Sequence, residues 1–227
     1  MNLHRATLQD CHNATGTVVV IDVLRAFTTA AYAFDAGTED IILVSTVEQA
    51  LTLREQMPET LLMGEVDGLP IPGFDLSNSP AELVNIDLTG RRLIQRTTSG
   101  TQGVVRSTHA ATLLTSSLVC AGATARFIQD QNPESLTFVI TGHRPGGWGD
   151  EDAACADYIE ELLSGHQPDQ EPFLERVRQS PPGKLFSDPT ELEFNPADLE
   201  YCLQIDRFDF VMLVKREDGL FIMKALG

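Results

Sequence analysis

The chain has 227 residues, 42% of them hydrophobic, and its 33 acidic residues against 16 basic ones give a formal net charge of -17. This length can bury the core of one large domain or two small ones, and the negative charge argues against a nucleic-acid or anionic-membrane partner, because the chain as a whole repels polyanions. Four scattered cysteines, no apolar run near the ~18 residues of a membrane helix and no signal-peptide pattern lead us to expect a soluble cytoplasmic protein with reduced thiols.

Apolar runs alternate with amphipathic stretches along the first part of the chain. Residues 17–22, TVVVID, are a continuous apolar run typical of a buried parallel strand. A helix follows and ends at Gly37, and its apolar face has i, i+3, i+4, i+7 spacing at Phe27, Ala30, Ala31 and Phe34. The next predicted elements are a strand at 40–45, a helix at 46–57, and strands at 61–65 and 91–97.

The second part of the chain continues the alternation. We expect a strand running into a helix over 113–131, a strand at 136–141 and an amphipathic helix through Cys155 and Leu162. The proline-rich segment 165–196 predicts an excursion with one short helix near 173–179, and residues 208–226 predict a closing hairpin around KREDG. The whole pattern predicts an α/β fold with a largely parallel sheet. A weak sequence similarity within the chain suggests two similar halves, residues 1–110 and 111–227.

Four polar stretches begin at predicted strand ends, which is where ligands collect in open α/β sheets. We therefore expect them to form a site. Their candidate residues are Asp22 and Arg25; Glu65, Asp67 and Asp75; Arg96, Thr97, Thr98, Ser99, Gly100 and Thr101; and His143, Arg144, Asp150, Glu151 and Asp152.

Each stretch also has a purely local interpretation. Asp22 could cap the following helix, and TTSGT at 97–101 could be an ordinary strand-to-helix turn instead of a phosphate cradle. Glu151 and Asp152 could complement the dipole of a helix that starts there. The glycine-rich stretch around Trp148 could be a simple loop or a lid.

Taken together, these residues favour phosphoryl chemistry. Several carboxylates with few neighbouring histidines or cysteines suit Mg²⁺ and not zinc. The candidate metal ligands are Asp22, Glu65, Asp75, Glu151 and Asp152. The candidate anion-binding residues are Arg25, Thr97, Thr98, Ser99, Gly100, Thr101 and Arg144. A metal ion together with an anion grip indicates an enzyme that transfers or hydrolyses phosphoryl groups.

Four motifs, VVVIDVLRAFTT, GEVDGLPIPGFDLSNSP, TTSGT and GDEDAACADYI, resemble in order the motifs of the 2-phosphosulfolactate phosphatase family (ComB-like proteins). The resemblance covers about residues 18–163. It implies a three-layer α/β/α fold with two similar halves and the site between them. It also implies Mg²⁺-dependent hydrolysis of the phosphate ester of 2-phospho-3-sulfolactate, a small anionic substrate on the route to coenzyme M. Ser99 departs from the asparagine that family members often have. A homodimer is a further expectation.

The resulting hypothesis gives catalytic roles to Asp22, Arg25 and Asp75. Asp22, Asp75 and one or two other carboxylates would organise Mg²⁺, and Arg25 and Arg144 would bind phosphate or sulfonate. A covalent variant, in which Asp22 attacks phosphorus, ranks lower because haloacid-dehalogenase phosphatases place an acid two positions on, where this chain has Leu24.

In GFDLSNSP, Asp75 is predicted to face the site, while Asn78 and Ser79 fix the turn and Pro80 begins a helix. Two rival functions stay open: a Mg²⁺ phosphatase of another small phosphate ester, and a non-catalytic anion-binding relative.

Overall fold

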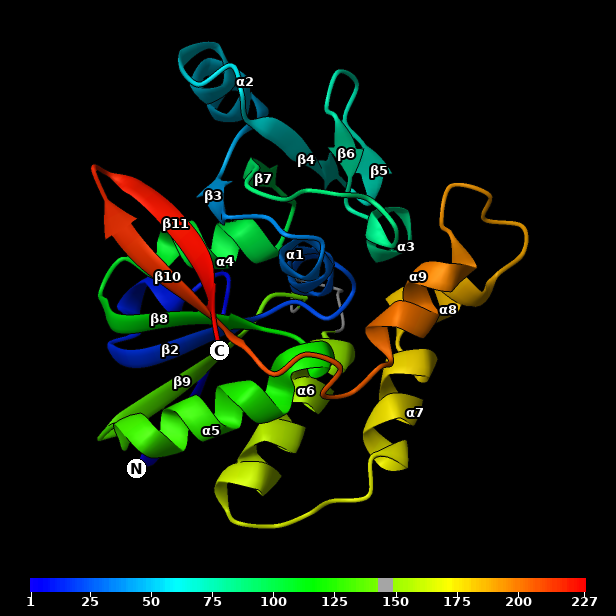
Figure 1. The fold of residues 1–227 in the computed structure, drawn as a ribbon. Helices are drawn as coiled ribbons and strands as arrows, with labels where there is room; N and C mark the ends of the chain where they lie inside the picture. Colours follow the sequence, from blue (N-terminus) through cyan, green and yellow to red (C-terminus); the bar gives the residue numbers. More distant parts are fainter. Residues whose placement is uncertain (143–148) are drawn as a thin grey trace.

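A computed structural model describes residues 1–142 and 149–227 (Figure 1). The strands are β1 Asn2–Thr7, β2 Gly16–Ile21, β3 Asp40–Val44, β4 Leu61–Val66, β5 Leu69–Pro70, β6 Leu76–Ser77, β7 Arg92–Arg96, β8 Ala110–Ser116, β9 Ser135–Ile140, β10 Val211–Glu217 and β11 Leu220–Leu226. The helices are α1 Ala26–Asp35, α2 Val47–Gln56, α3 Pro80–Leu83, α4 Gly100–Arg106, α5 Ala121–Gln131, α6 Asp150–Leu163, α7 Glu171–Gln179, α8 Pro181–Ser187 and α9 Pro196–Cys202, with 3-10 turns at Cys11–Asn13 and Leu118–Cys120.

The strands form one sheet in the order β1-β9-β2-β8-β10-β11-β3-β7-β4-β5, with β6 also paired to β4. The β10–β11 hairpin lies inside this sheet and pairs antiparallel with β8 on one side and with β3 on the other. It therefore joins two parallel groups, β1-β9-β2-β8 and β3-β7-β4. Its two-residue turn has positive φ at both Asp218 and Gly219, as the Asp-Gly pair predicts.

Helices bury both faces of the sheet, which confirms the prediction of a three-layer α/β/α fold (Figure 1). Along β2, Val18 and Val20 pack in one core cluster with α1 and α4, while Val19 and Ile21 pack in another with α5 and α6. Side chains alternate between faces along a strand, so a strand covered on both sides must be apolar throughout. Burial on both faces therefore explains the uninterrupted apolar run at residues 17–22.

The two predicted halves are interleaved in the sheet. Strand β2 comes from the first half of the chain but lies between β8 and β9, which come from the second. The division of the chain at residue 110 stays a prediction.

The proline-rich segment holds more helix than the sequence led us to expect. Its structure contains α7 and α8 and leads directly into α9, where one short helix was predicted. Prolines occupy the first or second position of all three helices, where a missing backbone N–H costs nothing. These prolines therefore mark helix starts, and the three helices lie together on one side of the molecule (Figure 1).

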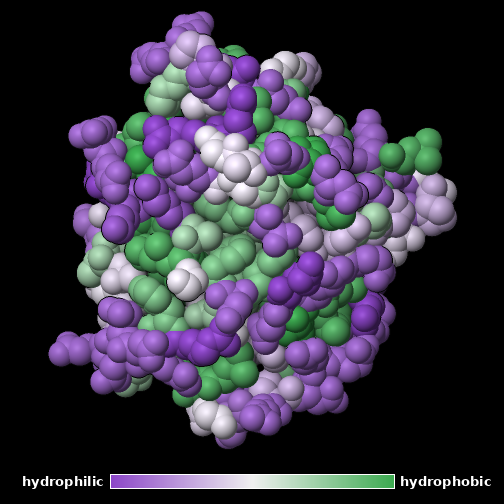
Figure 2. Space-filling view, in the orientation of Figure 1, coloured by the Kyte–Doolittle hydropathy of each residue, from purple (hydrophilic) through white to green (hydrophobic). Residues whose placement is uncertain are grey.

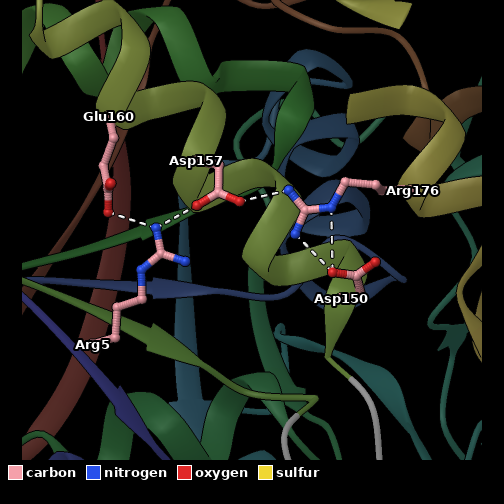
Figure 3. A network of polar contacts seen from close by, with 5 residues as sticks. All are labelled: Arg5, Asp150, Asp157, Glu160 and Arg176. Atoms are coloured by element: carbon pink, nitrogen blue, oxygen red, sulfur yellow. Dashed lines mark hydrogen bonds and ion pairs between the residues drawn. The ribbon is translucent and has the colours of Figure 1, made fainter. Parts of the chain in front are cut away.

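An ion-pair network ties α6 to α7 and to β1 (Figure 3). Arg176 of α7 bridges Asp150 at 2.7 Å and Asp157 at 2.5 Å, both on α6. Asp157 also pairs with Arg5 of β1, which in turn contacts Glu160 at 2.6 Å. Arg176 thus holds α6 at its first residue, next to Glu151 and Asp152.

We expect Arg176→Ala to lower the free energy of unfolding by about 1 kcal/mol, because two partly exposed ion pairs are lost. The loss should shrink in high salt, which screens such pairs. Urea unfolding at low and high salt measures it. The control is Arg178→Ala, since Arg178 pairs only with Glu171 and Glu175 of its own helix among the described ion pairs. Equal losses for both variants would contradict a role for the network between helices.

The face shown in Figure 2 has apolar side chains gathered around the C-terminus, between the β10–β11 hairpin and α1, with hydrophilic residues around them. Within the described residues, no helix is both long and apolar enough to cross a membrane. The homodimer stays a prediction, which light scattering in solution would test.

Candidate active site

A cavity of about 180 Å³ lies where β2, β4 and β7 end. It brings together Asp22, Arg25, Glu65, Thr98 and Ser99, all predicted site residues from three separate motifs. The remaining lining residues are Leu24, Asp67, Gly68, Asn78, Pro182, Leu185, Phe186 and Phe194. The lining therefore combines polar and charged side chains with an apolar wall, contributed mainly by α8 and the segment after it.

Asp22 is buried directly after β2. It caps a helix, as the local interpretation predicts, and it also lines the cavity, as the functional interpretation predicts. Its Oδ1 accepts a hydrogen bond from the Ala26 backbone N–H at 3.0 Å, so it does cap the start of α1. Its Oδ2 lies against Gly100, where a Cβ atom would stand only 2.9 Å away. Glycine is thus required for α4 to approach this carboxylate. Burial raises the pKa of Asp22 to about 6, and the charge of Glu65 adds to the effect.

Arg25 lies in the turn before α1 and is also buried. Its Nη1 forms an ion pair with Asp198 of α9 at 2.6 Å, and its Nη2 donates to the Gly68 carbonyl at 3.0 Å. The guanidinium carbon lies 4.8 Å from the centre of the Phe186 ring. These three contacts make Arg25 a fixed cation in the lining of the cavity.

Glu65 connects two loops of the cavity. Its Oε1 accepts from the Thr98 backbone N–H, and its Oε2 accepts from Gly68 N–H at 2.6 Å and from the Thr98 hydroxyl at 3.0 Å. The Thr98 hydroxyl in turn accepts from the Asp67 N–H at 2.8 Å. Both oxygens of Glu65 are thus engaged by the protein, which makes it a clamp between the turn after β4 and the turn after β7.

Glu151 and Asp152 lie in the first turn of α6, as the helix-dipole interpretation predicts, yet both are buried. Asp152 accepts from Val23 N–H and Gly142 N–H, each at 2.8 Å. The Oε2 of Glu151 is buried and has no hydrogen-bond partner among residues 1–142 and 149–227. Burial and the neighbouring charge of Asp22 raise the pKa of Glu151 to about 7, and burial with the charges of Glu151 and Asp22 raises the pKa of Asp152 well above its usual value.

These raised pKa values predict how stability depends on pH without added metal. In the unfolded chain Glu151 ionises near its ordinary pKa of 4.5, but the folded protein keeps this proton up to about pH 7. Folding therefore takes up a proton between these values, and stability must fall as pH rises through this window. We expect Glu151→Gln to raise the melting temperature more at about pH 8 than at about pH 5.5, measured in EDTA.

The matched control for this experiment is Glu160→Gln, which changes a partly exposed carboxylate of the same helix that already pairs with Arg5. An equal gain for Glu151→Gln at both pH values would contradict the account.

Other predicted residues lie elsewhere. Asp75 is outside the set that lines the cavity; its Oδ2 contacts Arg54 at 2.5 Å and the Leu62 N–H at 2.7 Å, so it links α2 to β4. Thr97 and Thr101 are buried and bond to each other, with Thr101 N–H donating to the Thr97 hydroxyl at 3.0 Å. They shape the turn into α4. Arg144, with His143 and Trp148, lies outside the described residues.

Several lining residues were not predicted from the sequence. Asn78, which was assigned to the turn, lines the cavity, and its buried Oδ1 has no partner in the part of the chain that the structure describes. Ser79 precedes α3 as predicted, but its hydroxyl donates to Asp198 at 2.6 Å and caps no backbone N–H. Phe186 and Phe194 come from the segment without a recognised motif. Arg25 follows directly after a buried strand, and a buried arginine needs an acidic partner, which was a reason to look for an acid such as Asp198.

The carboxylates are also the candidate ligands of a metal ion. Among the described residues, no group of three or more His, Cys, Asp or Glu side chains could hold a metal by itself. Mg²⁺, however, needs only one or two carboxylates when substrate phosphate and water supply the other oxygens. Asp22 and Glu151 fit this demand: the Glu151 Oε2 is buried and has no hydrogen-bond partner among the described residues, and the charge of Asp22 adds to the effect of burial in raising the pKa of Glu151.

The fold and the cavity define an α/β protein with a partly polar cavity at the carboxyl ends of its parallel strands, where open α/β sheets bind ligands. A family model described as 2-phosphosulpholactate phosphatase matches residues 3–217. The chain therefore belongs to the 2-phosphosulfolactate phosphatase family, which is a family of phosphoric monoester hydrolases, and the resemblance of its motifs is confirmed.

Individual relatives agree with the family match. The chain is 35% identical over 200 residues to a probable 2-phosphosulfolactate phosphatase of Bacillus subtilis, covering 88% of this chain and 87% of the relative. It is 33% identical over 218 residues to a protein of the same name from Carboxydothermus hydrogenoformans, covering 92% and 90%. A third, from Deinococcus radiodurans, is 40% identical over 164 residues, covering 72% and 68%.

Proposed function

We propose that the protein hydrolyses the phosphate ester of 2-phospho-3-sulfolactate to 3-sulfolactate and phosphate, with Mg²⁺ as cofactor, on the route to coenzyme M. The observation that carries this proposal is the convergence of Asp22, Arg25, Thr98 and Ser99 on one cavity. An arginine and hydroxyl groups beside a carboxylate can bind a phosphate and orient it toward an oxygen nucleophile. Family membership supports the same reaction class.

Each side chain has a distinct task in this reaction. Arg25 binds a phosphate oxygen through its planar guanidinium, and Ser99 contributes from the turn after β7, which Glu65 holds in place through Thr98. Asp22 orients the attacking water or accepts its proton, since a pKa of about 6 suits proton transfer near neutral pH. The proposed ligands of Mg²⁺ are Asp22 and Glu151. When bound, the ion would neutralise charge on the phosphoryl oxygens.

Phosphate release from 2-phosphosulfolactate, with Mg²⁺ and again with EDTA, tests the proposal. We expect turnover with Mg²⁺ and its loss on chelation. Turnover that survives EDTA would contradict the Mg²⁺ requirement but not the phosphatase. An absence of phosphate release from this ester and from a panel of small phosphate esters would favour a non-catalytic anion binder.

A second substrate class is favoured by the apolar wall of the cavity. Leu24, Leu185, Phe186 and Phe194 line it, and a substrate that carries a sulfonate and a carboxylate has no apolar group to place there. A small phosphate ester with an apolar alcohol portion would bury that portion against this wall. The same panel of esters, ranked by kcat/KM, distinguishes the two classes.

A further inference from the structure

Asp198 joins three segments of the chain although no recognised motif contains it. It lies on α9 and is fully buried, at 0% exposure. Its Oδ2 contacts the Arg25 Nη1 at 2.6 Å, and its Oδ1 accepts from the Ser79 hydroxyl at 2.6 Å and from the Ala81 N–H at 3.1 Å. One carboxylate therefore connects the turn before α1, the start of α3 and α9.

The same contacts fix the plane of the Arg25 guanidinium. Asp198 holds Nη1, the Gly68 carbonyl holds Nη2 at 3.0 Å, and the Phe186 ring covers one face at 4.8 Å. A guanidinium carries five N–H donors, and these two hydrogen bonds use only two of them. Among the described residues these are its side-chain hydrogen bonds, so donors remain for a ligand in the cavity that Arg25 lines.

Stability alone does not require a buried ion pair at this position. Two well-packed apolar side chains are often as stabilising as a buried ion pair, since both ions lose their hydration. A buried ion pair whose cation lines a cavity is different, because the carboxylate lets that cation stay buried, charged and oriented next to a ligand. Arg25 lines the cavity and pairs with Asp198, which is fully buried.

We infer that Asp198 is a positioning residue for substrate binding: it holds the Arg25 guanidinium in the orientation that receives the phosphate of the ester. The inference rests on the proposed function for its ligand. By its other oxygen Asp198 also fixes the start of α3, next to Asn78, so one acid sets two neighbouring parts of the cavity.

A double-mutant cycle on phosphate binding tests this inference. The dissociation constant of inorganic phosphate is measured by calorimetry, with Mg²⁺ present, for the wild type, Asp198→Asn, Arg25→Lys and the double variant. We expect Asp198→Asn to weaken binding about 10-fold, and the double variant to bind no more than about 2-fold more weakly than Arg25→Lys alone. Effects that multiply would show that Asp198 acts independently of Arg25 and would overturn the inference, as would unchanged affinity in Asp198→Asn.

Ser79→Ala is the matched control. It removes the hydrogen bond to the other oxygen of the same carboxylate and leaves the contact with Arg25 in place. Phosphate affinity within about 2-fold of wild type is expected. A loss equal to that of Asp198→Asn would mean that the carboxylate acts by fixing α3 and not by orienting Arg25, against the inference.

If Asp198→Asn does not fold, Asp198→Glu replaces it, because it keeps the charge and displaces the carboxylate by one methylene. Its phosphate affinity should fall by a similar factor, and wild-type affinity would overturn the inference. A crystal structure of whichever variant folds gives a second readout: we expect the guanidinium to leave its place over Phe186. A guanidinium that stays over Phe186 would overturn the inference, whether or not the wild type binds phosphate. A failure of the wild type to bind phosphate would count separately, against the proposed function.

Discussion

Replacing Asp22 with asparagine is expected to lower kcat for phosphate release at least about 10³-fold while the protein stays folded. Asparagine keeps the size of the side chain and an oxygen that can accept the Ala26 N–H, so the cap of α1 survives. What disappears is the negative charge at the end of β2, beside Arg25 and Thr98 in the cavity. Both the activated-water mechanism and the covalent variant need that charge.

Two measurements accompany this prediction. Thermal unfolding in EDTA should show a more stable variant near neutral pH, since a buried acid with a raised pKa no longer has to ionise. Asp35→Asn, which changes an exposed acid at the end of the same helix, should turn over like the wild type. Turnover of Asp22→Asn within a few-fold of wild type would eliminate both mechanisms.

Replacing Glu65 with glutamine should have the largest effect on stability, a loss of about 2–3 kcal/mol in the free energy of unfolding. The two carboxylate oxygens of Glu65 accept hydrogen bonds from Thr98 N–H, Thr98 Oγ1 and Gly68 N–H. The amide group of glutamine has one oxygen, so its NH₂ group must face a backbone donor and leave that donor unsatisfied. The loss should be the same with and without Mg²⁺, because Glu65 acts here as a loop clamp.

Urea unfolding measures this loss, with Asp67→Asn as its control. Asp67 is an exposed neighbour with positive φ, a conformation that asparagine also adopts, so its replacement should leave stability unchanged. A loss that appears only when Mg²⁺ is present would instead identify Glu65 as a metal ligand.

Those parts of the fold that depend on local pattern were predictable from the sequence. The run at 17–22 gave β2 because burial on both faces demands apolar residues throughout, and the Asp-Gly turn gave the final hairpin. Strand β1 was missed: four of its six residues are exposed, so it lacks the apolar pattern and owes its place to pairing with β9. The insertion of the hairpin between β8 and β3 depends on long-range pairing that no local pattern encodes.

The residues of the site likewise divide into those that the local pattern predicts and those that only long-range packing brings in. Asp22 and Thr98 were found because strand ends place them at one edge of the sheet. Asp75 follows the same rule by sequence but pairs with Arg54 on α2, a partner that spacing does not reveal. Phe186 lines the cavity and Asp198 contacts Arg25 from a segment distant in sequence, and only the packing of α8 and α9 brings them there.

The central position of the β10–β11 hairpin has a consequence for how the chain folds. One edge of β3 and one edge of β8 are covered only by the hairpin at residues 211–226. These residues lie more than 90 positions further along the chain, so the two edges stay open until the hairpin has been synthesised and has paired. Pairings of such long sequence separation give a high contact order and slow folding. Until the hairpin arrives, a nascent chain exposes two apolar strand edges, which are templates for aggregation. Shortening the chain before Val211 would make that transient exposure permanent.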